Sequence, residues 1–353
     1  MSTRTTTRGE IVTLMHGAGG RAMRRLIEET LTAGFGENGA AVGLAAMDDG
    51  AAFRIGPNRW LVLTTDSHVI HPIEFPGGDI GRLSIAGTVN DLAMMGATEP
   101  LGLTSAVILE EGFATETLER IQASMAATCG EAGATVVTGD TKVMGRGELD
   151  GMVINTTGVA LVERVVTDAG LAVGDRILVT GTIGDHGVAL MATRHDLDLE
   201  GDLRSDVAPI NGLIRVAIEA AVEAVGPDGD GIAAMKDPTR GGLASALHEM
   251  AEKAGVGIAI DGPSIPVSPA VASAAEILGL DPFHIANEGK AVLGVKSGAA
   301  DAVLGALRSH PLGADAAIVG EVTAEQVGRV VLDTGFGRRL VTEPEGEPLP
   351  RIC

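Results

Sequence analysis

The stretch "DRILVTGTIGDHGVALMATR", residues 175–194, predicts a strand, a glycine-rich turn and a helix in immediate succession. Residues 175–181 are a short apolar run that ends in a glycine, which is typical of a buried strand. The turn "GTIGDHG" follows at 181–187, and "VALMATR" then begins a helical pattern. This alternation is typical of proteins in which helices cover a sheet.

The same alternation continues on both sides of this stretch. On the N-terminal side, strands are expected at 58–66 and 134–140, and Leu118, Ile121, Met125 and Cys129 mark the apolar face of a helix over 115–133. On the C-terminal side, helices are expected at 188–197, 239–255 and 268–279, and strands at 255–261, 290–296 and 316–322. Ser268 is expected to cap the last of these helices, with Pro269 at its first position. The expected fold class is α/β (α+β).

The length of 353 residues favours two domains, because one core rarely serves more than about 200 residues. We expect an N-terminal α/β domain over 1–166, a C-terminal α/β domain over 167–337 and a flexible tail over 338–353. The segment 167–175 is the expected linker. Pro344, Pro348 and Pro350 deny the tail a helix and favour an extended conformation.

The composition limits the kinds of molecule that this protein is expected to bind and the compartment in which it is expected to work. With 26 basic and 47 acidic residues the formal charge is −21, and aromatic residues make up only 2%. Nucleic-acid binding usually requires a basic face, so nucleic acid is not an expected partner. No apolar run reaches the roughly 18–20 residues of a membrane span, and residues 1–10 lack the apolar core of a signal peptide. The two cysteines lack a Cys-x-x-Cys spacing, which favours a reducing compartment, the cytoplasm.

Five aspartates occur at predicted strand ends, in glycine turns or on a largely apolar helix: Asp49, Asp66, Asp91, Asp140 and Asp237. Ligands of α/β sheets collect at strand ends, and Mg²⁺ is usually held by carboxylates together with phosphates. Any one of these aspartates alone is better explained as a helix cap or turn residue. Together they predict a site for a metal and a phosphate.

Two glycine-rich turns precede predicted helices and are candidate phosphate cradles: "HGAGG" (16–20) and "GTIGDHG" (181–187). Neither is a Walker A motif, and the second is equally well a simple turn between strand and helix. "DPTRGGL" (237–243) is more specific, because a carboxylate, an arginine and two glycines open one helix together.

Lys142 and Glu288 are candidates for a catalytic role. Lys142 follows Asp140 by two positions and faces the same side of an extended backbone. Glu288 lies in a polar turn immediately before an apolar strand. The alternative for both is an exposed surface charge. His68, His71 and His186 lack a metal-binding spacing and are expected to be structural or supporting residues.

The two cysteines differ in their setting. Cys129 falls on the apolar face of its helix and is expected to be buried, whereas Cys353 is the last residue of the sequence. The twelve residues from Thr342 can span roughly 40 Å, enough to carry this thiol into another site. Cys353 is therefore the cysteine expected to be available for chemistry.

Six motifs, taken in order along nearly the whole chain, resemble the hydrogenase maturation factor family HypE: "MDDGAA", "TTDSHVIHPIEFPGGDIGRLSIAGTVNDLAMMGATEP", "TGDTKV", "DPTRGGL", "NEGKAVLGV" and the final "PRIC". The internal motifs alone are similar to the wider superfamily of aminoimidazole ribonucleotide synthetase, selenophosphate synthetase and thiamine-monophosphate kinase. The final Pro-Arg-Ile-Cys narrows the resemblance to HypE.

The resemblance implies a two-domain aminoimidazole ribonucleotide synthetase-like fold and a homodimer whose N-terminal sheets meet in a barrel-like interface. It implies ATP and Mg²⁺, and a carbamoyl group delivered to the terminal cysteine by the carbamoyltransferase HypF. The product is a cysteine thiocyanate, whose cyanide passes to iron on the HypC–HypD complex for the nickel–iron hydrogenase centre.

The resemblance also assigns roles to residues of this sequence. The five aspartates match the family's nucleotide and metal carboxylates, and Asn90, Thr138 and Gly139 flank two of them in the same motifs and are expected at the nucleotide. Lys142 and Glu288 match polar groups around the carboxamide on Cys353. Two alternatives remain: a kinase or synthetase that acts on a free small substrate, and a non-catalytic cyanide carrier whose aspartates are structural.

Overall fold

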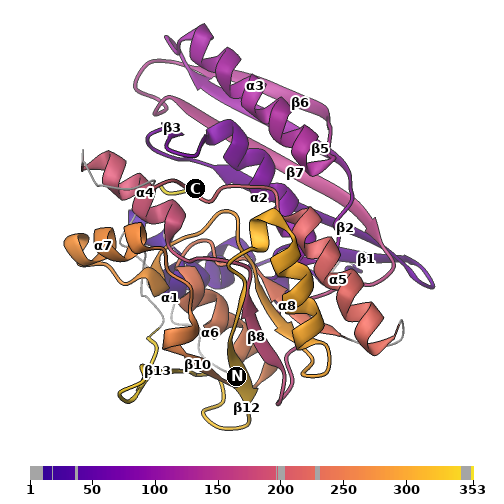
Figure 1. Ribbon diagram of the computed structural model, residues 1–353. Helices are drawn as coiled ribbons and strands as arrows, with labels where there is room; N and C mark the ends of the chain where they lie inside the picture. The colour runs from indigo at the N-terminus through magenta and orange to yellow at the C-terminus, as the bar shows by residue number, and fades with distance from the viewer. Residues whose placement is uncertain are drawn as a thin grey trace.

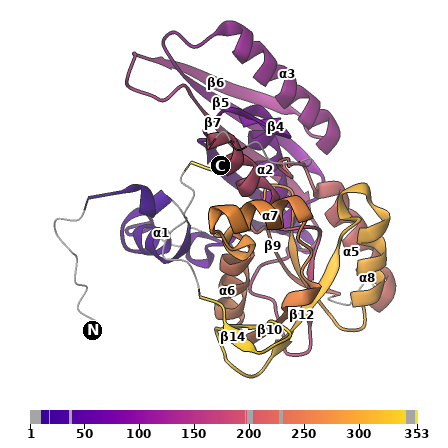
Figure 2. The same cartoon turned by 60° about the vertical axis from the view of Figure 1, so that its left-hand side comes forward.

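Two sheets organise the chain, one in each half (Figure 1 and, from a second side, Figure 2). The computed structural model describes residues 11–17, 19–35, 39–195, 197, 203–226, 231–342 and 351–353. None of the described helices is long and apolar enough to span a membrane.

The N-terminal sheet has five strands in the order β1-β2-β7-β5-β6. Their bounds are Ala51–Gly56 (β1), Arg59–His68 (β2), Pro100–Glu110 (β5), Val136–Met144 (β6) and Met152–Val162 (β7), and the short pair Glu74–Phe75 (β3) and Gly78–Asp79 (β4) lies apart from it. Only β5 and β6 run parallel. Helices α2 (Ile80–Met94) and α3 (Thr115–Ala132) lie over one face (Figure 1).

Alternation along β7 explains why one face of this sheet is covered and the other is open. From Met152 to Ala160 every second residue is buried, and the residues between them are partly exposed. Successive side chains of a strand point to opposite faces, so the buried set faces the helices. Strand β6 lies at the edge of the sheet, and all its residues from Val136 to Val143 are exposed.

The C-terminal sheet has seven strands in the order β14-β13-β10-β12-β8-β11-β9. Their bounds are Arg176–Val179 (β8), Ile232–Lys236 (β9), Gly257–Asp261 (β10), Val292–Val295 (β11), Ala317–Thr323 (β12), Val330–Asp333 (β13) and Arg338–Leu340 (β14). Its helices are Asp185–Arg194 (α4), Asn211–Val225 (α5), Gly242–Ala254 (α6), Pro269–Leu278 (α7) and Ala300–Ser309 (α8).

Strand β8, the first element in the stretch 175–194, is buried on both faces. Ile177 and Val179 join a core with Leu243 and Leu247 of α6, whereas Leu178 joins a core with Leu213 of α5 and residues of α8. A strand segment covered by helices on both sides requires apolar residues at successive positions, which is why Ile177, Leu178 and Val179 follow one another without polar alternation. The predicted α/β architecture, the Ser268 cap and the burial of Cys129 are all confirmed.

The predicted linker 167–175 is packed rather than exposed. It contains no helix or strand, yet Asp168 and Leu171 are buried. A Cβ on Gly170 would lie 2.0 Å from the carbonyl oxygen of Ala233, so the backbone approaches β9 too closely for any other residue. The segment is therefore packed against the C-terminal half and is not a free linker.

The tail begins later than the sequence predicted. Arg338–Leu340, placed in the flexible tail, form β14 and pair antiparallel with β13. The glycine-rich turn at 335–337 allows this hairpin, which the prolines further along do not affect. Residues 343–350, which carry those prolines, lie outside the described residues.

Candidate active site

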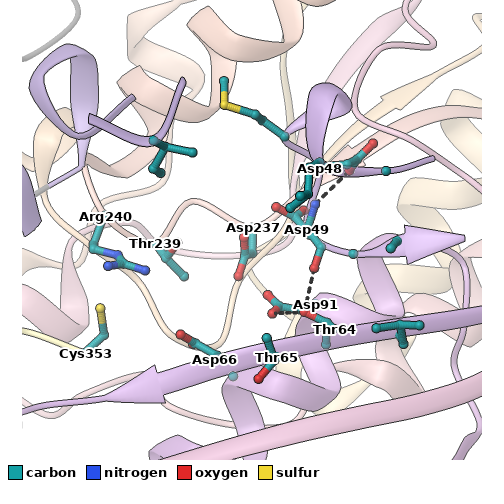
Figure 3. Close-up of a pocket in the computed structure, with 18 of the residues that line it drawn as sticks. Asp48, Asp49, Thr64, Thr65, Asp66, Asp91, Asp237, Thr239, Arg240 and Cys353 are labelled. Atoms are coloured by element: carbon teal, nitrogen blue, oxygen red, sulfur yellow. Dashed lines mark hydrogen bonds between the residues drawn. The ribbon is translucent and has the colours of Figure 1, made fainter. Parts of the chain in front are cut away.

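A pocket of about 540 Å³ lies between the two halves and collects most of the acidic residues that the sequence singled out (Figure 3). Its lining includes six carboxylates, one arginine and one thiol: Asp48, Asp49, Asp66, Asp91, Asp237, Glu288, Arg240 and Cys353. A pocket of this size is typical of small-molecule and cofactor sites.

Thr64 of β2 ties two of the carboxyl-bearing segments together. Its hydroxyl oxygen lies 2.8 Å from the main-chain oxygen of Asp49 and 2.9 Å from Oδ2 of Asp91, as the dashed lines in Figure 3 show. Asp49 precedes β1 and Asp91 lies on the buried helix α2, while Asp237 follows β9 directly. Three elements that are distant in the sequence thus present their carboxyl groups to one space.

Crowding of like charges in a buried place shifts the pKa values of these groups. Burial, followed by the charge of Asp49, raises the pKa of Asp237 to about 8. Burial, then Asp237 and Asp66, raises the pKa of Asp91 well above its ordinary value. A bound cation would relieve this repulsion, so the pocket favours a positively charged ligand.

One carboxyl group in the pocket keeps its charge more easily. Burial opposes ionisation of Asp66, but His68 and Arg240 outweigh it and lower its pKa. Nε2 of His68 lies 3.6 Å from Oδ2 of Asp66. His68 is thus a supporting residue, as the sequence analysis expected.

A buried lysine lies among acidic residues next to the pocket. Nζ of Lys236 lies 2.8 Å from Asp49, 3.3 Å from Glu249 and 3.4 Å from Asp168. Burial alone would lower its pKa, but these carboxylates together raise it well above the ordinary value. Lys236 is therefore charged and holds Asp49 in place.

The carboxylates fit a hard cation that takes only some of its ligands from the protein. Oδ2 of Asp49 is buried and has no hydrogen-bond partner within the described part of the chain. In the same part of the chain, no three His, Cys, Asp or Glu residues form a ready-made metal cage. Mg²⁺ commonly keeps several waters and binds one or two carboxylates plus phosphate oxygens, which suits such a partial set.

Glu288 is buried in the pocket wall, not on the surface. Only 4% of it is exposed, and its Oε1 has no hydrogen-bond partner among the described residues. Burial, then the charges of Asp237 and Asp206, raises its pKa well above the usual value. A carboxylate with a raised pKa is a stronger base than an ordinary one.

The glycine turn at 16–20 contacts this site, whereas the turn at 181–187 does not line it. A Cβ on Gly19 would lie 2.9 Å from Cβ of Arg240, and Gly19 and Gly20 both have positive φ. At the other turn, the main-chain N–H of Gly184 donates to Oδ1 of Asn287 at 2.7 Å. "GTIGDHG" is thus a structural turn between strand and helix.

Four residues of strand β6 that were predicted for the site lie outside this pocket. Thr138, Gly139, Asp140 and Lys142 belong to the exposed edge strand β6. Nζ of Lys142 lies 2.8 Å from Oδ2 of Asp140, so the two share one side of the strand as predicted. A Cβ on Gly139 would lie 2.2 Å from the carbonyl oxygen of Ser105, so this glycine serves the pairing of β5 with β6. The structure does not bring these residues to the chain's own pocket.

Asn90, expected at the nucleotide, has its amide group committed elsewhere. Its Nδ2 donates to the main-chain oxygens of Ala208 and Glu288, and its Oδ1 accepts from the N–H of Ile210 at 2.8 Å. Because position 90 of α2 faces the C-terminal half, Asn90 fastens the two halves together.

Several residues of the site were not singled out from the sequence. Asp48, Thr64 and Thr239 line the pocket, and Lys236 lies next to it with its partners Asp168 and Glu249. Lys236 offered a signal, because a lysine that ends the apolar run "GIAAMK" directly before Asp237 must find a partner if the strand is buried. Asp168 and Glu249 offered none, because only the fold places them beside this lysine.

Comparison with known family models shows the class of proteins to which this chain belongs. Residues 47–162 match the N-terminal domain of AIR synthase related proteins and residues 172–333 match their C-terminal domain. This is a class of two-domain proteins, as the two sheets and the pocket between them indicate.

Closer relatives identify the family within this class. Carbamoyl dehydratase HypE of Bradyrhizobium diazoefficiens is 47% identical, with 98% of this chain and 97% of that protein covered. HypE of Escherichia coli is 42% identical over 97% of this chain and 99% of that one. This chain belongs to the HypE family of hydrogenase maturation proteins.

Solved structures agree with this assignment. A HypE–HypF complex aligns with a TM-score of 0.82 at 42% identity, covering 90% of this chain and 99% of that one. A HypE structure in complex with ATP aligns with a TM-score of 0.77 at 40% identity, covering 97% and 100%.

Proposed function

We propose that this chain is a carbamoyl dehydratase that uses ATP to convert an S-carboxamide on its own Cys353 into a thiocyanate, the source of cyanide for a hydrogenase iron centre. One observation carries the proposal: Cys353 lies in the same pocket as the crowded aspartates (Figure 3), and Glu288 lines that pocket too. The related carbamoyl dehydratases and the structure of HypE in complex with ATP support it.

The reaction must remove water from S–C(=O)–NH₂, and oxide is too poor a leaving group at neutral pH. Attack of the carboxamide oxygen on the γ-phosphorus of ATP forms a C–O–P bond and releases ADP, while one N–H proton leaves. Loss of the second N–H proton then forms the C≡N bond and breaks the C–O bond, with phosphate as the leaving group. The positioning and charge stabilisation are the protein's part of such phosphoryl transfer.

The pocket residues suit these tasks. Glu288, with its raised pKa, is the proposed base for the N–H protons. Asp49, Asp66, Asp91 and Asp237 would hold Mg²⁺, which supplies positive charge against the phosphate oxygens. Arg240, between the glycine turn and Cys353, would face the phosphates.

We further propose a homodimer in which Asp140 and Lys142 serve the site of the partner chain. The exposed strand β6 and its neighbour β5 carry large apolar side chains on the surface, among them Leu101, Val137 and Val143. An edge strand of this kind is suited to pairing with a second copy. In that arrangement Lys142 would balance charge on the oxygen or the departing phosphate.

Mixing two inactive variants tests this sharing. Asp140→Asn and Cys353→Ser chains should each be inactive alone, and mixed dimers should regain thiocyanate formation because the Cys353→Ser chain supplies Asp140 to the other chain's site. Mass spectrometry of the Cys353-containing chain is the measurement. Absence of any recovery in dimers shown to be mixed would contradict a shared site.

The proposed partners are HypF, which would deliver the carbamoyl group, and the HypC–HypD complex, which would receive the cyanide in the cytoplasm. The solved structure of a HypE–HypF complex supports the first. Nucleic acid is not among the proposed partners, given the formal charge of −21.

Intact-protein mass spectrometry tests the function directly. After incubation with HypF, carbamoyl phosphate and ATP, the chain should gain one carbamoyl group and then lose the mass of one water. Cys353→Ser should show neither change. A carbamoyl adduct that persists unchanged in the presence of ATP and Mg²⁺ would refute the dehydratase assignment.

A further inference from the structure

The last three residues are held against the body of the protein through their main chain. The N–H of Val69 donates to the carbonyl of Cys353 at 3.0 Å, and the N–H of His71 donates to that of Arg351 at 3.3 Å. The chain end thus runs antiparallel to the segment after β2. In Figure 1 the C-terminal label lies beside helix α4.

Helix α4 contributes two side chains to this contact. Nε2 of His186 lies 2.7 Å from the carbonyl oxygen of Ile352, and Arg194 donates to the carbonyls of His71 and Arg351. His186 and Arg194 thus contact the backbone of the tail and not its side chains. Arg194 also joins the two antiparallel segments to one helix.

The bonds of His186 determine its tautomer. The carbonyl of Ile352 can only accept, so Nε2 carries the proton. Nδ1 then accepts from the hydroxyl of Ser205 at 2.7 Å, and that hydroxyl oxygen in turn accepts from the N–H of Val207 at 3.1 Å. The edge of Phe75 meets the imidazole ring at 5.5 Å between centroids, so the ring cannot turn freely. The donor is therefore held ready for the tail.

Side chains of the tail add to the backbone contacts. Ile352 is only 2% exposed and belongs to a core cluster with Ile70, Val188 and Ile285. Arg351 pairs with Asp150. Because Ile352 is buried directly before Cys353, it would restrict the positions that the thiol can take.

We propose that His186 and Arg194 are positioning residues that grip the carbonyls of Ile352 and Arg351 and so place the Cys353 thiol in the pocket. The role of these hydrogen bonds in catalysis rests on the proposed function, whereas the hydrogen bonds themselves do not.

Thiol labelling of the full chain, without ATP or HypF, tests the grip. A bulky maleimide should label Cys353 about tenfold faster in His186→Leu than in the unsubstituted chain, because a lost buried hydrogen bond shifts the docking equilibrium by about that factor. His186→Gln, which keeps a donor, should stay closer to the unsubstituted rate. Equal rates for His186→Leu and the unsubstituted chain would overturn the proposal.

Two controls separate loss of docking from loss of folding. His248→Leu is matched, because Nε2 of His248 bonds the carbonyl of Val341 at 2.9 Å in the same domain, and it should leave Cys353 labelling unchanged. The buried Cys129 reports unfolding and should stay unlabelled in every variant.

The tail side of the contact gives a second, independent test. Ile352→Asp should also accelerate labelling, and adding His186→Leu to it should give little further increase, because both changes undo one docked state. An Ile352→Asp chain labelled no faster than the unsubstituted chain would overturn the proposal even if His186→Leu were destabilised. A failed mass-spectrometric test of dehydration would refute the function but leave these labelling rates as they are.

Discussion

Glu288→Gln is expected to slow conversion of the carboxamide to the thiocyanate by about 10²–10⁴-fold, the usual range for removing a general base. Glutamine keeps the size and shape of the side chain but cannot accept the N–H protons. The rate should be followed by mass spectrometry on chains carbamoylated beforehand, so that only the ATP-dependent step is measured.

The pH dependence sharpens this prediction. Because burial and the neighbouring Asp237 and Asp206 raise the pKa of Glu288, the unsubstituted chain should gain rate as pH rises through that elevated pKa. Glu288→Gln should lose this dependence. It should not lose stability, because a raised carboxyl pKa means that the fold disfavours the charged form that glutamine removes.

Glu276→Gln is the matched control. Glu276 is exposed on α7, so the same chemical change there should leave the rate unaltered. A Glu288→Gln chain that forms thiocyanate at the unsubstituted rate would remove Glu288 from the mechanism.

Lys236→Met is expected to destabilise the protein by about 3–5 kcal/mol, the usual cost of breaking a buried ion pair on one side. Methionine fills similar space, but Asp49, Asp168 and Glu249 would be left without the ammonium group between them. Nζ of Lys253 still lies 2.6 Å from Oδ2 of Asp168, so the loss of the countercharge would affect Asp49 most. Chemical denaturation at neutral pH is the measurement.

The loss of stability caused by Lys236→Met should be smaller at acidic pH. Without the lysine the buried carboxylates would take up protons more readily, so the difference between Lys236→Met and the unsubstituted chain should shrink as pH falls. Lys142→Met serves as control, because that lysine is exposed and its pair with Asp140 contributes little to stability. A Lys236→Met chain as stable as Lys142→Met at neutral pH would contradict a structural role for the buried lysine.

Local patterns of the sequence predicted the elements well. The apolar run at 175–181 became β8, and the spacing of Ile121, Met125 and Cys129 became the buried side of α3. Such patterns record which side of a helix or strand avoids water, and that information lies within a few neighbouring residues.

The site was predicted less evenly. Asp49, Asp66, Asp91, Asp237 and Glu288 were named from their motifs and share one pocket with Cys353. Lys236 and Asp168 were missed, because the need for a buried countercharge becomes visible only when three segments are seen together. Asn90 resembled a ligand in its motif but bonds the other half of the fold.

The sequence by itself determined the α/β elements, the set of acidic motifs and the scarcity of thiols that singles out Cys353. Only the tertiary structure decided which carboxylates meet, that Asp140 and Lys142 stand on an open edge strand, and that α4 holds the last three residues. The reason is physical: periodic burial is a local property of the chain, whereas charge crowding and docking depend on contacts between segments far apart in sequence, which exist only after the two halves pack.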